Sequence, residues 1–186
     1  MPARVSSRVA AVTDDPGVAA FNGLPEDRAL AELAVCNAAT GWAAAIEAGR
    51  PYADRVAVLA AADRISAGLA VAAVRVALDG HPRIGARACG GEAGSRWSQD
   101  EQSGVRREEA TLASLERGNR DYEERFGHIY LVCASGLDAE QMLADLRARL
   151  ANDEQTEQRV VAAELAKIAR LRLGKLLDEM ATGEQA

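Results

Sequence analysis

His81 is the first residue whose type and position could support acid–base chemistry. It lies in the segment GHPRIG (residues 80–85), where a predicted helix gives way to glycine-rich sequence. Pro82 disfavours helical backbone angles at His81 and so restricts the direction of its side chain. An imidazole that faces a cavity can exchange protons near pH ~6.5. The same ring could instead cap the carbonyl groups of the helix end, and the local sequence leaves both interpretations open.

The segment SQDEQ (residues 98–102) is the second candidate. Ser98 and Glu101 have the spacing of a capping box, with Ser98 as the N-cap of a helix, and this structural role explains both residues. The same geometry also suits a binding site. The free N–H groups of a helix N-terminus bind anions, and a carboxylate there can accept a substrate proton. The two interpretations do not exclude each other.

The other polar candidates are weaker. We expect His128, in FGHIY (residues 126–130), to be a loop residue whose backbone matters more than its ring. Arg159, near the start of the last predicted helix, is ordinarily a solvated charge but could bind a carboxylate through two hydrogen bonds. Two distant histidines and no clustered cysteines do not form a metal site. The chain also lacks glycine-rich phosphate loops and the GxSxG serine motif.

Helices are expected to position these residues. Alanine, leucine, glutamate and arginine dominate, aromatic residues make up only 4% of the chain, and apolar residues recur at helical spacing. The expected helices cover residues 16–22, 28–36, 40–48, 54–78, 98–117, 119–126, a stretch from 138, and 152–180. We therefore predict an all-α fold, a single-domain helical bundle over residues 16–180 that follows a flexible N-terminus at residues 1–15.

Two segments depart from this helical pattern. Residues 80–97 contain five glycines, and a loop of this length in a compact domain is usually functional or disordered. Residues 127–135 (GHIYLVCAS) are apolar and rich in residues that favour strands. They are either a short buried strand or an extended connector.

Charge and cysteine content restrict partners and compartment. The net charge of −6 (22 basic minus 28 acidic residues) repels phosphate backbones, so no nucleic acid is expected as a partner. The cysteines at positions 36, 89 and 133 are odd in number and far apart, which favours a reducing cytoplasm. No apolar stretch approaches the ~20 residues that span a membrane. We recognise neither a secretory signal at the N-terminus nor a peroxisomal address at the C-terminus.

Several short motifs occur together in a specific order and spacing. They are His81-Pro82-x-x-Gly85, Ser98-x-x-Glu101-Gln102, Asn119-x-x-Tyr122-x-x-Arg125-Phe126-Gly127-His128-Ile129-Tyr130, Glu157-x-Arg159 and Glu164-Leu165-x-x-Ile168-x-x-Leu171-Arg172-Leu173. Phe21-Asn22 and Arg50-Pro51-Tyr52 belong to the same pattern. Each motif alone is weak. Their combination, over roughly residues 16–175, resembles the OHCU decarboxylase family, which acts on 2-oxo-4-hydroxy-4-carboxy-5-ureidoimidazoline (OHCU) in uric acid degradation.

The resemblance implies an all-α enzyme, commonly a homodimer, that converts this small molecule to (S)-allantoin without a metal or organic cofactor. By position, His81 matches the family's catalytic histidine and Glu101 its paired carboxylate. The matching substrate-binding positions are Pro82, Ser98, Gln102, the backbone of His128, Ile129, Tyr130, Leu131 and Val132, and the side chain of Arg159.

Two other functions are compatible with the same sequence. The chain could be a helical binding module in which the glycine-rich loop docks a protein. It could also be a decarboxylase of a related ureido or imidazoline acid, because these motifs do not define the substrate range.

Overall fold

A computed structural model of the chain describes residues 13–81 and 109–183. The helices are α1 (Pro16–Gly23), α2 (Glu26–Cys36), α3 (Thr40–Ala48), α4 (Arg55–Ala67), α5 (Val71–Asp79), α7 (Glu109–Phe126), α8 (Ala139–Arg149) and α9 (Glu154–Thr182). The described residues contain no strand. The predicted all-α fold is confirmed.

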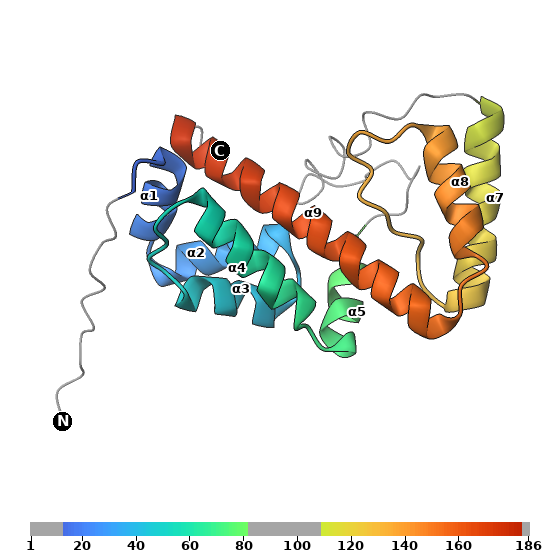
Figure 1. Cartoon of the computed structure of the whole chain (residues 1–186), viewed down its shortest axis with the longest axis horizontal. Coiled ribbons are helices and arrows are strands. Elements are labelled where there is room, and N and C mark those ends of the chain that lie inside the picture. Colours follow the sequence, from blue (N-terminus) through green and yellow to red (C-terminus); the bar gives the residue numbers. More distant parts are fainter. Residues whose placement is uncertain (1–12, 82–108, 184–186) are drawn as a thin grey trace.

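The long helix α9 organises the molecule. Figure 1 shows it running across the view, with α1–α5 along one part of it and α7 and α8 at its N-terminal end. Asp153 caps α9 by accepting a hydrogen bond from the backbone N–H of Thr156 at 2.7 Å. Buried residues follow at helical spacing, including Val161, Leu165 and Ile168. This apolar face packs against α1, α2, α4 and α5.

Two hydrophobic cores flank an extended connector, residues 129–134. The larger core is built from α1–α5 and α9, and the smaller one from α7 and α8. Side chains of an extended chain alternate between its two sides. Ile129, Leu131 and Cys133 accordingly pack on the larger core, whereas Tyr130, Val132 and Ala134 belong to the smaller one. The strand-like composition of residues 127–135 therefore belongs to a connector buried on both sides, not to a sheet.

The helix expected over residues 54–78 is divided in two. Gly68 is the C-cap of α4, and its N–H bonds to the carbonyl of Ile65 at 3.1 Å. After this break, α5 leaves at 110° to α4. The prediction of one helix was wrong because both pieces bury an apolar face, so the periodicity continues across the break. No single helix within residues 13–81 and 109–183 is long and apolar enough to cross a membrane, although the bent pair α4–α5 meets the test by length and composition.

The break expected at Gly118 is absent, because α7 runs without interruption to Phe126. A Cβ atom at position 118 would lie 2.5 Å from Cδ2 of Leu146 on α8. The glycine therefore permits close contact between α7 and α8 and does not end a helix. At the start of α8, the predicted capping box is confirmed, since Asp138 and Gln141 bond reciprocally to each other's backbone N–H groups at 2.9 Å.

Candidate active site

The end of α5 holds His81 in a defined orientation. Gly80 is the C-cap of α5, and the backbone N–H of His81 bonds to the carbonyl of Leu78 at 3.0 Å. The imidazole Nδ1 lies 2.8 Å from the carbonyl oxygen of Ala77. Because a carbonyl oxygen only accepts hydrogen bonds, Nδ1 must carry a proton, and Nε2 of the neutral ring is left with a lone pair. The helix-capping role considered for His81 is thus confirmed.

The second ring nitrogen of His81 has no hydrogen-bond partner among the described residues. Its Nε2 atom is buried and makes no hydrogen bond within the described part of the chain. Burial lowers the pKa of His81 to about 4, and the positive charge of Arg172 acts in the same direction, against the opposing bond to Ala77. The imidazole is therefore neutral at pH 7, and no described residue occupies the lone pair of Nε2, which can accept a proton or a hydrogen bond.

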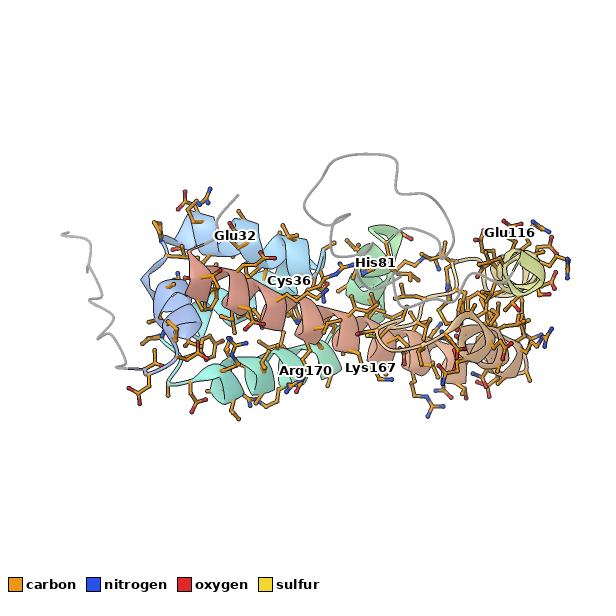
Figure 2. The ribbon with its side chains drawn as sticks, turned by 90° about the horizontal axis from the view of Figure 1, so that it is seen from above. Glu32, Cys36, His81, Glu116, Lys167 and Arg170 are labelled. Carbon is orange, nitrogen blue, oxygen red and sulfur yellow. The ribbon has the colours of Figure 1, made fainter. Side chains whose placement is uncertain are left out.

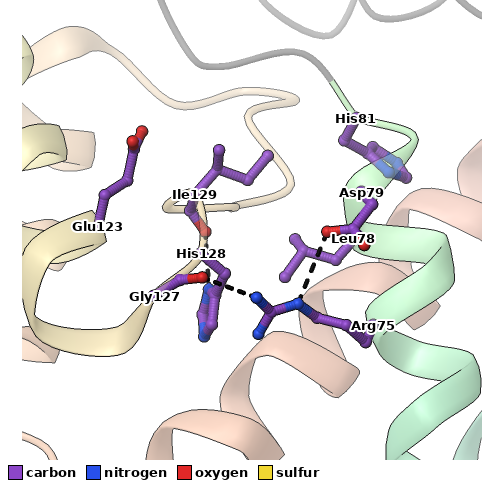
Figure 3. A pocket seen from close by; sticks show the side chains of 8 residues that line it. All are labelled: Arg75, Leu78, Asp79, His81, Glu123, Gly127, His128 and Ile129. Carbon is purple, nitrogen blue, oxygen red and sulfur yellow. Dashed lines mark hydrogen bonds and ion pairs between the residues drawn. The ribbon is translucent and has the colours of Figure 1, made fainter.

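A hollow of about 400 Å³ adjoins His81, and we call it the His81 hollow. Among the described residues it is lined by Arg75, Leu78, Asp79, His81, Glu123, Gly127, His128 and Ile129. Figure 3 shows α5 on one side of it and the end of α7 with the start of the connector on the other. In Figure 2, His81 lies between the part of the molecule that contains α2 and the part that contains α7. A small polar ligand suits a site of this size.

Arg75 joins the two walls of the His81 hollow. Its Nη2 donates to the carbonyl of Gly127 at 2.7 Å, and its Nε lies 3.6 Å from Asp79. Gly127 has a φ of 68°, which glycine adopts without strain. A second hollow of about 570 Å³ shares Arg75, Leu78 and His128 with the first, and contains Arg159. We call it the Arg159 hollow.

His128 and Arg159 are placed differently from His81. The ring of His128 packs edge-on against Tyr122, with centroids 5.5 Å apart, and its Nδ1 lies 3.0 Å from the carbonyl oxygen of Ile129. Arg159 is exposed and bonds only weakly to its own helix, at 3.2 Å to the carbonyl of Gln155 and 3.4 Å to Thr156. Its guanidinium group therefore remains available to a carboxylate.

Three contacts from side chains of the helices hold the connector in place. The hydroxyl of Tyr130 donates to Asp145 at 2.6 Å, and the carbonyl of Leu131 accepts from Arg149 at 2.7 Å. The N–H of Cys133 donates to Glu164 at 2.8 Å. The N–H groups of residues 129–132 donate to no other described residue. Side chains from α8 and α9 thus take the place of the neighbouring strand that an extended segment normally needs.

The contact to Leu131 belongs to a buried network centred on Glu157. This carboxylate accepts hydrogen bonds from Tyr122, from Arg149 Nε at 2.8 Å and from Asn152 at 2.8 Å. Burial alone would raise the pKa of Glu157, but these hydrogen bonds outweigh burial and lower it. Burial and the bond to Glu157 raise the pKa of Tyr122. The ion pair is therefore charged on both sides at neutral pH.

The predicted site residues fall into four groups. His81, His128 and Ile129 come together around the His81 hollow. Tyr130, Leu131 and Val132 follow along the connector with their side chains buried in the two cores, and Arg159 lies in the adjoining hollow. The predicted residues Pro82, Ser98, Glu101 and Gln102 lie outside the described residues.

Sequence reasoning missed Arg75, Arg149 and the anchoring role of Glu157. Arg149 follows Met142 and Leu146 on the buried face of α8, and Glu157 precedes Val161 on that of α9. A charged residue at an apolar helical position was the signal for a buried ion pair. Arg75 is half exposed and follows no such pattern. Among residues 13–81 and 109–183, no three His, Cys, Asp or Glu side chains are arranged to hold a metal ion.

Comparisons with known proteins identify the family to which the chain is similar. The OHCU decarboxylase family matches residues 22–174. The 2-oxo-4-hydroxy-4-carboxy-5-ureidoimidazoline decarboxylase of Amia calva is 32% identical over 143 residues, which are 75% of this chain and 82% of that protein. The uric acid degradation bifunctional protein TTL of Arabidopsis thaliana is 36% identical over 72 residues, 39% of this chain and 22% of that protein.

Solved structures give the same result. A crystal structure of OHCU decarboxylase in the presence of (S)-allantoin has a TM-score of 0.69 and 27% sequence identity, covering 79% of this chain and 97% of that one. The crystal structure of an (S)-allantoin synthase shares the fold, with a TM-score of 0.63 at 18% identity over 86% of this chain and 53% of that one. Together with the matched family pattern, these likenesses show that the chain belongs to the OHCU decarboxylase family.

Proposed function

We propose that the chain decarboxylates OHCU to (S)-allantoin in uric acid degradation and that the His81 hollow is its active site. The observation that supports this site best is the neutral imidazole of His81. Its Nδ1 is held by Ala77, and its buried Nε2 has no partner within the described part of the chain. An unpaired buried nitrogen costs free energy, and a ligand that bonds to it recovers that cost. The family membership supplies the identity of the ligand.

The chemistry of the substrate explains why protein side chains and backbone groups are sufficient to catalyse this decarboxylation. When the bond between the ring carbon and the carboxylate breaks, carbon dioxide leaves and the electron pair flows into the adjacent C=N bond of the ring. A proton is then added to the neighbouring carbon. The hydroxyl loses its proton to form the carbonyl of allantoin, and the ring nitrogen that received the electron pair takes up a proton in its place. Since the ring accepts the electrons itself, the protein has only to orient the substrate, exclude water and deliver protons on one face.

His81 is suited to proton transfer. Its base form predominates at pH 7 because its pKa is depressed to about 4. A bound substrate carboxylate would raise that pKa, since a nearby negative charge favours the imidazolium form. The ring can thus accept a proton in the complex and return it to the product carbon. In this proposal Glu101 is the paired carboxylate that engages the 4-hydroxyl or a ring N–H.

Binding groups surround this pair in the proposal. The N–H groups of residues 129–132 have no acceptor among the described residues, and preorganised donors of this kind contribute roughly 3–4 kcal/mol at comparable sites. Arg159 binds a substrate anion from the adjoining hollow, with Pro82, Ser98 and Gln102 completing the site. The cytoplasmic location and the homodimer stay predictions.

One assay tests the proposed function. OHCU is generated in situ from urate with a urate oxidase and a hydrolase, its loss is followed by ultraviolet absorbance, and the product by circular dichroism. We expect faster loss than in the absence of the chain and an excess of (S)-allantoin. Spontaneous decay at an unchanged rate, with racemic allantoin as the product, would refute the assignment.

A further inference from the structure

We propose that Arg149 is a positioning residue for this reaction: by holding the carbonyl of Leu131, it orients the N–H of Val132 as a hydrogen-bond donor to the substrate. The inference rests on the proposed function. Arg149 itself lies in the smaller core, with 4% of its side chain exposed, and lines neither hollow. It therefore acts through the connector and not by contact with the reacting atoms.

The geometry of the peptide bond carries the effect from Arg149 to Val132. Arg149 Nη1 donates to the carbonyl oxygen of Leu131 at 2.7 Å. In a trans peptide the C=O and the following N–H lie in one plane and point in opposite directions. The carbonyl of Leu131 points to Arg149, so the N–H of Val132 points to the other side of the connector. No other described residue accepts a hydrogen bond from that N–H.

Glu157 fixes the orientation of the Arg149 guanidinium group that holds the Leu131 carbonyl. It bonds to Arg149 through Nε at 2.8 Å and through Nη2 at 2.5 Å, which leaves Nη1 directed at Leu131. The rings of Tyr122 and Tyr130 lie over the same guanidinium, with centroids 5.7 Å and 4.8 Å from its central carbon. The planar group has one orientation in this cage, and a flexible ammonium group would not reproduce it.

The cost of the buried pair points to a role beyond stability. Glu157 and Arg149 expose 1% and 4% of their side chains. Desolvating two charges offsets most of their attraction, and apolar or neutral replacements of a buried pair often leave stability unchanged or improved. Fixing a peptide plane of the connector, whose first residue Ile129 lines the His81 hollow, is a use that such replacements would not supply. The second anchor, from the N–H of Cys133 to Glu164, lies one peptide farther along the same connector.

The test removes the pair while keeping the fold. The double variant Arg149→Met/Glu157→Gln leaves no unpaired buried charge and keeps an amide oxygen for Tyr122, but the carbonyl of Leu131 loses its donor. The chain contains a matched control. Arg50, paired with Glu47 at 2.9 Å, is equally buried and holds the carbonyls of Phe21 and Leu24 at 2.8 and 2.7 Å, in the larger core. The control variant is Arg50→Met/Glu47→Gln.

The readouts are thermal unfolding and the separate values of kcat and KM for OHCU, normalised to folded protein. We expect kcat/KM of the Arg149 double variant to fall by up to roughly 10²-fold, mainly through KM, because small displacements of binding groups have effects of this size. The Arg50 control should lose stability at most and keep its kcat/KM. Equal kcat/KM in the two double variants would overturn the proposal.

Two further arms keep the result interpretable. Arg149→Lys keeps the positive charge, but its ammonium group cannot bond to Glu157 and to the Leu131 carbonyl at the same time in the geometry of the guanidinium group. This variant should therefore raise KM, and it provides a test if the double variant does not fold. Unchanged KM in Arg149→Lys would count against positioning. If the unmodified chain fails to accelerate OHCU loss, the proposed function itself has failed. If the unmodified chain is active and the Arg149 variants keep its KM and kcat/KM, only the positioning role is refuted.

Discussion

The unprotonated state of His81 has a measurable consequence for stability. Its pKa is lowered to about 4 in the folded chain, whereas an unfolded histidine titrates near ~6.5. Between these two values the unfolded state binds more protons than the folded state. The free energy of unfolding therefore falls as the pH drops through this window, and the contribution of His81 is fully present only above ~6.5.

The size of this effect follows from the two pKa values. Lowering the pH from about 7.5 to about 4.5 should cost the folded state about 2.5 kcal/mol through His81 alone, since each unit of pKa difference corresponds to about 1.4 kcal/mol. The variant His81→Asn cannot titrate. Because every other titrating group is present in both proteins, the difference in unfolding free energy between them isolates this residue.

Urea unfolding at a series of pH values measures that difference. The wild-type chain should lose its stability relative to His81→Asn progressively below pH ~6.5 and level off near pH ~4. A difference that does not change with pH would mean that His81 titrates alike in both states. The buried neutral imidazole, and the free Nε2 that the proposed mechanism uses, would then be refuted.

Four more perturbations test other parts of the structure. Arg149→Met alone should lower the free energy of unfolding by about 3–5 kcal/mol, measured in urea, because it leaves Glu157 buried without its partner. Gly17→Ala should destabilise by at least ~1–3 kcal/mol, since its Cβ would lie 2.0 Å from a backbone carbonyl of α9. Gly174 lies inside α9, and a Cβ atom added there would have no neighbour within 4 Å among the described residues beyond the adjacent backbone of its own helix. Gly174→Ala should therefore stabilise the fold by ~0.5–1 kcal/mol in the same experiment. Arg159→Gln should raise KM for OHCU more than it lowers kcat, because it removes ground-state binding of an anion; an unchanged KM would exclude that role.

The sequence was sufficient for the fold class and most helices because each buried face repeats at helical spacing. It was not sufficient at the two glycines where the pattern is ambiguous. Gly68 ends α4, whereas Gly118 lies inside α7 and makes room for Leu146. A glycine suits a helix end and a close helix contact equally well. Only the position of the neighbouring helix distinguishes the two uses.

The candidate site was predictable where its residues belong to short motifs that can be recognised in the sequence. His81, His128 and Ile129 were identified from sequence and lie around one hollow. The contacts that orient the connector were not predicted, because Arg149 and Glu157 pair across the turn between α8 and α9. Helical spacing places residues on a face, but the partner across an interface depends on how two helices meet.

The central claim is that the imidazole of His81 accelerates the decarboxylation of OHCU. The most direct measurement compares the wild-type chain with His81→Asn on OHCU generated in situ at pH 7.5, by following the circular dichroism of allantoin while far-ultraviolet spectra confirm the helical fold. The account predicts rapid formation of (S)-allantoin by the wild type and a loss of ~10²–10⁴-fold or more in the variant. A folded His81→Asn variant as fast as the wild type would contradict it.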